Sequence, residues 1–518
     1  MGSDLVRPWS RDFEDYLRDE SRRVGSADSI SFPASEAEVI EIVNSVLGAV
    51  NTPPDHGVAP DQVCNGHITI QGARTGIVAG AVPQGGHVLN MSRMKNISTI
   101  DEGSCGLTVQ PGVLLSEIQG VVSKEGLFFP PDPTETSASI GGMVACNASG
   151  AISFAYGPTR NWIDSLRIVL SDGSTLFLKR GQNYAQGRSF SLTTENGRII
   201  AGDLPYYILP NVKSAAGYYV ADNMDLIDLF IGMEGTLGVV TEIGLRLIPR
   251  PKAVAGLAVF LPSEEAALRL VRVLRREEVD GFEQMTVRPV AIEFFNSDAL
   301  DLLRRAKSNY PAFEAIPTLK PHFHTAIYTE FHGDNEDDLE EAVMQAMDAI
   351  TALGGNDDDT WYATSEREME PLKAFRHAIP EAVNLLIDER KRNCPELIKL
   401  GTDMSVPDAH LEKVLDMYKT GLSEEDLESV IFGHIGNNHV HVNILPKNMD
   451  DYERGKSLYL RWAGQILDLG GSVSAEHGIG KIKAPFLKMM YGDDGIAQMR
   501  TLRLLFDPNM LLNPGNLF

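Results

Sequence analysis

The clearest alternation of apolar and polar positions lies over residues 429–446. An apolar run at 430–432 comes first, and from Val440 onwards apolar residues alternate with polar ones, which is the period of a half-buried strand. Asn437 and Asn438 stand between the two segments, and asparagine tolerates the positive φ that a two-residue hairpin loop requires. The pattern therefore predicts a β-hairpin. Its second strand presents three polar side chains on one face: His439, His441 and Asn443.

The same hairpin places two histidines opposite each other. With a two-residue loop, His434 faces His441 across the strands, and cross-strand Cβ atoms lie about 4.5–5.5 Å apart. Two imidazoles at that distance can bind one divalent metal. The candidate third ligand is Glu476, which precedes His477 in the glycine-rich stretch GGSVSAEHGIGK. Two histidines and one carboxylate leave coordination positions open, as in catalytic sites; the alternative is an ordinary solvated strand face.

A second pattern recurs after residue 260, where an apolar strand leads through a capping residue into an amphipathic helix. Strands and helices that alternate in this way, together with hairpins, predict an α+β sheet covered by helices on one face. The predicted strand–helix pairs are 325–328 with 336–353 and 403–406 with 411–418, and a further helix begins at 262–265.

Three glycine-rich turns lie beside apolar segments in the first half of the chain. The first follows a short strand at 67–70 and carries Gly72, Gly76 and Gly80, without the Gly-Lys-Ser/Thr ending of a Walker loop. Alone it could be an ordinary tight turn. Two more such stretches, at 129–157 and 226–251, indicate instead one extended ligand that lies along a sheet, with unobstructed backbone N–H groups suited to a pyrophosphate.

Length, charge and cysteine content narrow the class of protein. A chain of 518 residues predicts two or three domains, and its net charge of −25 argues against nucleic acid and anionic membranes as partners. No apolar run approaches the roughly 20 residues of a membrane span, and the N-terminal stretch has no signal-peptide core, so we expect a cytoplasmic protein. The cysteines form no CxxC pair and are expected to be buried, reduced thiols rather than iron–sulfur ligands: Cys64, Cys105, Cys146 and Cys394.

Seven motifs together resemble one family of flavoproteins. They are GARTGIVAGAVP, PPDPTETSASIGG, CNASGAISFAYG, GMEGTLGVVTEIGLRL, GHIGNNHVHVN, SAEHGIG and LFDPNMLLNPGNLF, and they span nearly the whole chain. The chain is similar to the vanillyl-alcohol oxidase/p-cresol methylhydroxylase superfamily, and within it to the D-lactate dehydrogenase, glycolate oxidase D-subunit and D-2-hydroxyglutarate dehydrogenase branch.

The resemblance implies a specific α+β architecture. After an N-terminal extension at 1–30, residues 31–251 would form a two-subdomain FAD-binding domain. Residues 252–518 would form an α+β, ferredoxin-like cap domain for the substrate. Its helical C-terminal segment, 485–518, would pack back on the FAD-binding domain.

The resemblance also implies a non-covalent FAD, because the first glycine-rich loop has no histidine for a covalent attachment. That loop departs from the usual family sequence RGGGTG, since Gln71 replaces the arginine and Ala73-Arg74 replaces two glycines. The Arg74 side chain either pairs with a phosphate or points away. The implied FAD contacts are Gly72, Ala73, Arg74, Thr75, Gly76, Gly80, Pro131, Asp132, Ser137, Gly141, Gly142, Asn147, Ser149, Gly150, Tyr156, Glu234, Gly235, Gly238 and Asn513, with Ile243 near the adenine.

By the same resemblance the metal ligands are His434, His441 and Glu476, the three residues that the spacing selects. Zinc is the first choice of metal, with manganese and iron as alternatives. His477 matches the family's proposed general base, and Arg376 matches an arginine that binds the substrate carboxylate; the alternative for Arg376 is a surface position on a helix. His439 and Asn443 complete the predicted catalytic set: His439 is an additional basic group beside the metal, and Asn443 shares its strand face.

These residues predict the oxidation of a D-2-hydroxy acid, D-lactate-like as first choice, by hydride transfer to FAD. Glycolate and D-2-hydroxyglutarate are alternative substrates. The D-2-hydroxyglutarate branch has a lysine where this chain has Gly401, and Lys399 lies two residues earlier, which puts a second carboxylate contact in doubt. Two competing functions are a transferase like alkyl-glycerone-phosphate synthase and a non-catalytic flavin-binding subunit. Expected partners are an external electron acceptor (an electron-transfer flavoprotein, quinone, cytochrome or oxygen) and a second copy in a homodimer.

Overall fold

The computed structural model describes residues 5–51, 66–101 and 103–518, and its N-terminal lobe contains two four-stranded sheets. The first sheet has the order β1 (Arg7–Pro8), β2 (Ser29–Ser31), β4 (His87–Asn90) and β3 (Ile68–Gln71), in which β2, β4 and β3 run parallel. Helix α1 (Glu36–Asn51) covers this sheet with a buried apolar stripe that includes Val39, Ile42 and Val43. The strand predicted at 67–70 is therefore present, one residue later.

The second sheet of this lobe is antiparallel, with the order β5 (Gly106–Val109), β11 (Val239–Arg246), β7 (Ile163–Val169) and β8 (Thr175–Lys179). Its inner residues join a large apolar core with helix α2 (Leu115–Val122) and helix α3 (Ile140–Cys146). The remaining elements are α4 (Ser153–Tyr156), the hairpin β9 (Ser189–Thr193) with β10 (Ile199–Asp203), and the pair β6 (Leu127–Phe128) with β12 (Ile248–Pro249).

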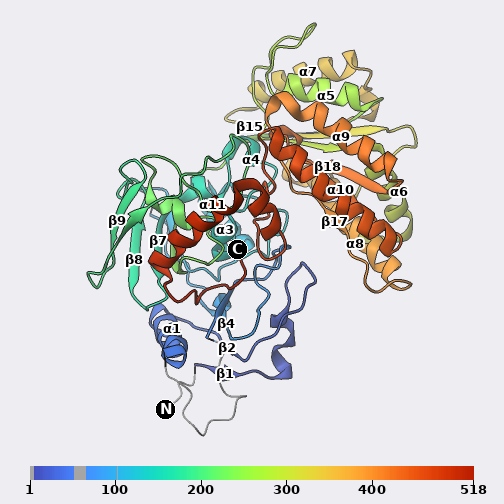
Figure 1. Ribbon diagram of the computed structural model, residues 1–518. Helices are drawn as coiled ribbons and strands as arrows, with labels where there is room; N and C mark the ends of the chain where they lie inside the picture. Colours follow the sequence, from blue (N-terminus) through green and yellow to red (C-terminus); the bar gives the residue numbers. More distant parts are fainter. Residues whose placement is uncertain (1–4, 52–65, 102) are drawn as a thin grey trace.

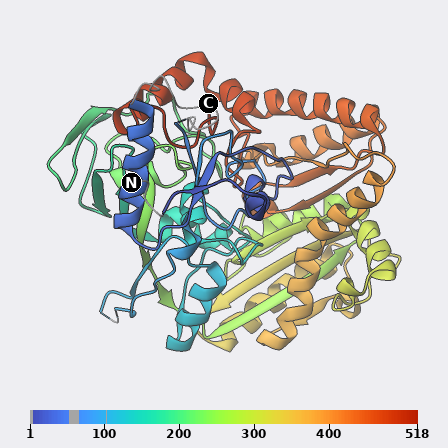
Figure 2. The same ribbon diagram turned by 90° about the horizontal axis from the view of Figure 1, so that it is seen from below.

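The C-terminal half forms a seven-stranded antiparallel sheet, the cap sheet, which lies to one side of the N-terminal lobe (Figures 1 and 2). Its order is β16 (Trp361–Ala363), β13 (Ala253–Leu261), β15 (Thr325–Gly333), β14 (Ala291–Phe295), β18 (Ser429–Gly433), β19 (His441–Ile444) and β17 (Leu400–Gly401). This mixed arrangement confirms the predicted α+β class.

Helices cover both faces of the cap sheet, so the prediction of a single covered face is wrong. Ile327 and Phe331 of β15 pack with α5 (Glu264–Leu274) and α7 (Glu336–Ala352). Ala326 and Tyr328, which point to the other face, pack with α6 (Ser297–Asn309) and α8 (Glu366–Lys391). The physical reason is that β15 is apolar at successive positions and buries both faces.

The chain ends by returning to the N-terminal lobe. After α9 (Leu411–Glu424) and α10 (Met449–Asp468), helix α11 (Ala484–Phe506), interrupted at Gly492, runs across that lobe (Figure 1). Beyond it, the backbone N–H of Ile68 donates to the carbonyl of Leu511 at 2.8 Å, and Asn513 donates to the carbonyl of Ile68 at 2.7 Å. The last residues therefore extend the edge of β3, directly before the first glycine-rich turn.

The histidine hairpin differs from its prediction in turn and register. The connection is a 3-10 turn (Ile435–Asn437) followed by Asn438 in the left-handed conformation, and Phe432, not His434, pairs with His441. Both strands are buried on both faces rather than half-buried. The predicted strand at 403–406 is also wrong, because Ser405 makes only isolated bridges, to His439 and to Ser472.

Two further expectations concern cysteines and membrane spans. Cys105, Cys146 and Cys394 are free and partly buried, and Cys64 lies outside the described residues. Within the described ranges, no helix is both long enough and apolar enough to cross a membrane.

Candidate active site and metal centre

The imidazoles of the hairpin converge on the carboxylate of Glu476. Nε2 of His434 lies 3.2 Å and Nε2 of His441 lies 3.3 Å from Oε1 of Glu476. Nδ1 of His439 lies 4.0 Å from the other oxygen, Oε2. These four residues each offer a ligand atom, and the atoms all lie within 4.8 Å of one another. The structure thus brings the three residues selected as metal ligands together and adds His439 as a fourth neighbour.

The outer nitrogens of two rings are held by oxygen acceptors. Nδ1 of His434 lies 2.7 Å from Oε1 of Glu293, and Nδ1 of His441 lies 3.0 Å from the carbonyl of Thr402. Contacts of this kind orient metal-binding imidazoles and fix their tautomer. Nδ1 of His439 is buried without a hydrogen-bond partner. Converging nitrogens, one carboxylate and an unpartnered buried nitrogen fit a divalent metal of zinc-like preference.

Several charged side chains surround the carboxylate of Glu476. Burial alone would lower the pKa of His434, but the carboxylates of Glu293 and Glu476 raise it to about 9. Burial would raise the pKa of Glu476, yet His434 and Lys213 hold it well below its usual value. Oε2 of Glu476 accepts hydrogen bonds from Nζ of Lys213 at 2.6 Å and from Oγ of Ser149 at 3.0 Å. Without a metal, the cluster is therefore an ionised carboxylate among cationic groups.

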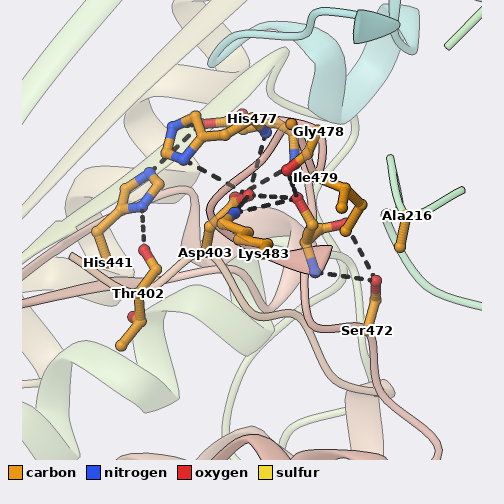
Figure 3. A network of polar contacts seen from close by, with 12 residues as sticks. Ala216, Thr402, Asp403, His441, Ser472, His477, Gly478, Ile479 and Lys483 are labelled. Atoms are coloured by element: carbon orange, nitrogen blue, oxygen red, sulfur yellow. Dashed lines mark hydrogen bonds and ion pairs between the residues drawn. The ribbon is translucent and has the colours of Figure 1, made fainter. Parts of the chain in front are cut away.

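Asp403 shapes the turn that carries Glu476 and His477 (Figure 3). Its fully buried carboxylate accepts from Nζ of Lys483 at 2.5 Å and from Oγ of Ser474 at 2.8 Å. It also accepts from the backbone N–H groups of Glu476, at 3.2 Å, and His477, at 3.0 Å. Burial opposes ionisation, but His477 and Lys483 keep the pKa of Asp403 well below its usual value.

His477 lies at the edge of this cluster, with its ring stacked on that of His441 at a centroid distance of 5.3 Å and an angle of 14°. Its Nδ1 is 3.4 Å from Oδ2 of Asp403, and its Nε2 is 3.6 Å from Oε1 of Glu476. Burial lowers the pKa of His477 to about 4. The imidazole is therefore neutral at pH 7, which is the state that can accept a proton.

Arg376 is buried near the cluster and is not a surface residue of α8. Its Nη1 lies 3.6 Å from Oδ2 of Asp132, which comes from the second glycine-rich stretch of the N-terminal lobe. Its Nη2 contacts Nε2 of His377 at 2.5 Å. Burial raises the pKa of Asp132 to about 6, although Arg376 opposes this shift. A guanidinium in this position can bind a carboxylate as a fork.

The first glycine-rich turn packs against the second. A Cβ at Gly72 would lie 2.1 Å from Oγ of Ser139, whereas a Cβ at Gly76 would meet nothing within 4 Å. The backbone at Gly76 therefore faces open space, which would allow a phosphate group to approach it. Arg74 points away from it: its guanidinium lies 4.3 Å from the Tyr16 ring centroid and donates to the carbonyl of Asp15.

The third glycine-rich turn is joined to the chain end by Glu234 and Asn513. The Glu234 carboxylate accepts the backbone N–H groups of Ile479 at 2.6 Å and Gly480 at 2.7 Å, and burial raises its pKa to about 7. Asn513 donates to the carbonyl of Glu234 at 2.7 Å. A cavity of about 570 Å³ lies beside this turn, and Asn147, Ser214 and Gly232 are among its lining residues. The three turns thus fit an extended nucleotide cofactor.

Two residues predicted to contact FAD are hydrogen-bonded to other side chains instead. The Tyr156 hydroxyl lies 2.8 Å from Nδ1 of His332 in the cap sheet, and exposed Ser137 donates to Glu135. Asn443 faces the backbone of Gly401, where a Cβ would lie 3.0 Å from its Oδ1. Other predicted cofactor residues lie in the first loop or are glycines where an added Cβ would meet a neighbouring atom: Ala73, Thr75, Gly80, Gly141, Gly142, Gly150, Gly235 and Gly238.

Sequence reasoning missed several residues that complete the site. Glu293 is a single acid inside the apolar strand AIEFF, and this contrast could have identified it. Thr402 contributes only its carbonyl, and Lys213 and Lys483 lie in segments without a recognisable pattern. Their roles follow only from tertiary contacts.

The chain matches two family models of FAD-linked proteins and is similar to several dehydrogenases. Residues 250–517 match the model of the FAD linked oxidases, C-terminal domain, and residues 59–179 match that of an FAD binding domain. The chain is 29% identical over 468 residues to a D-lactate dehydrogenase of Anaerostipes hadrus, covering 88% of this chain and 86% of that protein. It is 29% identical over 514 residues to a D-2-hydroxyglutarate dehydrogenase of Xanthomonas citri pv. viticola, covering 98% and 93%.

A solved structure of alkyldihydroxyacetonephosphate synthase is similar with a TM-score of 0.65 and 17% sequence identity. The match covers 99% of this chain and 82% of the synthase chain. At this identity the likeness shows a shared fold alone.

Proposed function

Because the chain belongs to the FAD-linked oxidases, in the D-lactate and D-2-hydroxyglutarate dehydrogenase branch of the vanillyl-alcohol oxidase/p-cresol methylhydroxylase superfamily, we propose that it oxidises a D-2-hydroxy acid to the 2-oxo acid. When bound, FAD supplies the acceptor for the C2 hydride, and a divalent metal supplies a Lewis acid for the 2-hydroxyl. The proposal includes an external electron acceptor, such as an electron-transfer flavoprotein, a quinone or a cytochrome.

The observation that carries this proposal is the convergence of His434, His441 and Glu476 next to a neutral imidazole. The three would hold the metal, because their donor atoms meet within 3.3 Å at Oε1 of Glu476. Glu293 and Thr402 orient the two rings from behind. A metal held in this way could bind the hydroxyl group of a substrate. The arrangement therefore supports a dehydrogenase rather than a transferase that shares only the fold.

His477 is the residue proposed to accept the hydroxyl proton, at Nε2. This nitrogen lies on the Glu476 side of the ring, while Nδ1 lies 3.4 Å from the Asp403 carboxylate. Asp403 would then stabilise the imidazolium that forms, as a carboxylate does for a catalytic histidine. Arg376 would hold the substrate carboxylate through its planar guanidinium, in competition with Asp132.

The positions of Lys399 and Gly401 support a small monocarboxylic substrate. Nζ of Lys399 donates to Asn384 of α8 at 2.9 Å, so this cation is already engaged. Gly401 lies against Asn443 and offers no side chain to a distal carboxylate. D-lactate-like acids are therefore proposed ahead of D-2-hydroxyglutarate, whose second carboxylate would need another cation.

An anaerobic titration tests this proposal directly. The purified flavoprotein is mixed with D-lactate, L-lactate, glycolate and D-2-hydroxyglutarate in turn, and the flavin absorbance is followed. We expect D-lactate to bleach the flavin band, L-lactate to leave it unchanged, and D-2-hydroxyglutarate to need a much higher concentration. A flavin that none of these acids reduces would contradict the proposed function.

A further inference from the structure

The two oxygens of Glu476 have different partners. Oε1 faces Nε2 of His434 at 3.2 Å and Nε2 of His441 at 3.3 Å. Oε2 accepts from Nζ of Lys213 at 2.6 Å and from Oγ of Ser149 at 3.0 Å. The side chains of Lys213 and Glu476 are only 11% and 9% exposed. One oxygen is thus available to the imidazole cluster, and the other is occupied by a buried cation.

Lys213 is fixed in place by its backbone as well as by its charge. Oγ of Ser405 donates to the carbonyl of Lys213 at 2.5 Å. Two residues later, the N–H of Ala215 donates to the carbonyl of Ser474 at 2.8 Å, in the turn that carries Glu476. The segment of the N-terminal lobe that bears Lys213 is therefore docked onto the loop of the metal ligand. This lysine is not a surface side chain that happens to reach a carboxylate.

We propose that Lys213 is a positioning residue that reserves Oε2 of Glu476, so that this carboxylate binds the metal through Oε1 alone. The proposal rests on the metal site of the proposed function and goes beyond it. A carboxylate with both oxygens free can bind a metal in bidentate fashion and occupy a position that the substrate needs. The ammonium also carries the same sign of charge as the metal, and the two repel each other in a buried site.

This role predicts an effect on metal affinity opposite to that of a purely structural lysine. If Lys213 only neutralises Glu476 so that the site can form, its removal leaves a disordered carboxylate and weakens metal binding. If Lys213 restrains Glu476, its removal gives the metal both oxygens and relieves the repulsion. Metal binding then becomes tighter, while turnover falls because a coordination position is lost.

The test uses the full-length flavoprotein with Lys213→Met and Lys213→Gln. Lys213→Gln keeps a hydrogen-bond donor for Oε2 and removes the charge. It therefore tests the effect of the charge if Lys213→Met does not fold. The matched control is Lys213→Arg, which retains the cation and can still donate to Oε2. The zinc dissociation constant is measured by competition with a chelator, and zinc-edge X-ray absorption reports the number of oxygen ligands.

We expect Lys213→Met to bind zinc about tenfold more tightly or better, with one more oxygen ligand, and Lys213→Gln to bind zinc more tightly without the added oxygen ligand, because its amide still donates to Oε2. Lys213→Arg should stay within about threefold of the wild type, because it keeps both the charge and a donor for Oε2. Unchanged or weaker zinc binding by both charge-removing variants would overturn the inference while leaving the proposed function intact. A wild-type protein that binds no stoichiometric metal would instead overturn the metal site and the inference with it.

Discussion

Glu293 of the cap sheet accepts a 2.7 Å hydrogen bond from Nδ1 of His434, whose other nitrogen faces Glu476. Glu293 is buried in an otherwise apolar strand, where an unpaired carboxylate would be costly. His434 offsets that cost, and Glu293 in return fixes the ring so that Nε2 points into the cluster. The pair thus couples the cap sheet to the proposed metal centre.

Glu293→Gln should weaken metal binding. The amide can still accept the hydrogen bond, but it lacks the charge that makes His434 a better ligand, so we expect a loss of about tenfold in affinity. Chelator competition with metal analysis measures it. Glu330→Gln is the matched control, because Glu330 is also buried and bonded to a histidine, His332, outside the cluster. Equal effects of both changes would argue against a specific role for Glu293.

His477→Gln should lower kcat by roughly 10²–10⁴-fold, the usual contribution of a general base. Flavin and metal content should not change, because neither depends on the imidazole in this account. Steady-state turnover with D-lactate, together with flavin absorbance and metal analysis, separates these effects. His322→Gln, at an exposed position, is the control. A His477→Gln enzyme with full activity would refute the assignment.

The KM for D-lactate should rise with pH as Asp132 ionises. The pKa of Asp132 is about 6 because of burial. Below that pH the carboxyl is protonated and leaves Arg376 free for the substrate; above it the carboxylate competes for the guanidinium. We expect the wild-type KM to increase roughly fivefold from about pH 5 to about pH 7.5.

Asp132→Asn should keep the low KM across this range, because the amide carries no charge at any pH. Asp388→Asn, an exposed change on the helix that carries Arg376, should retain the wild-type pH dependence. A wild-type KM that does not change with pH would count against competition between Asp132 and the substrate.

The ionisation of Glu234 should lower the free energy of unfolding of the protein as pH rises. Burial places its pKa at about 7 in the folded state, above the ordinary glutamate value of 4.5. The folded protein therefore holds an extra proton in this window. The resulting stabilisation is complete below about pH 4.5 and is lost as pH increases through about 7, by at most about 3 kcal/mol.

Thermal unfolding of the flavin-free protein over this pH range measures the effect. Glu234→Gln should lower Tm at acidic pH, because it loses a carboxyl bonded to two N–H groups. The gap to wild type should shrink toward neutral pH. Glu340→Gln, exposed on α7, should follow the wild-type curve at every pH. A gap that widens as pH rises would contradict the argument.

The sequence predicted that His434, His441 and Glu476 lie together, although the predicted hairpin register was wrong. The predicted register places His434 opposite His441, whereas Phe432 occupies that position. His434 lies beyond the end of β18, at the start of the 3-10 turn, and its ring still lies next to that of His441. Their ring centroids are 5.6 Å apart. A Cβ at Gly436, within this turn, would lie 3.0 Å from the Phe154 ring, which is a tertiary contact that the local sequence pattern does not show.

The sequence could not reveal which distant residues pair with the predicted site residues. Lys213 is 263 positions from Glu476 along the chain, and Glu293 is 141 positions from His434. No local pattern encodes such pairs. The two-sided cap sheet was missed for a related reason, since β15 mixes apolar residues with Thr329 and Glu330 and its sequence does not show that helices bury both of its faces.

The most direct test of the account is the rate of flavin reduction by D-lactate before and after metal removal. The protein is dialysed against a chelator under anaerobic conditions, checked for retained flavin, and mixed with D-lactate in a stopped-flow instrument. Zinc or manganese is then added back. We predict that the depleted protein keeps its flavin but reduces it at least about 100-fold more slowly, and that added metal restores the rate. Flavin reduction at the full rate without metal would contradict the central claim that His434, His441 and Glu476 form a catalytic metal site.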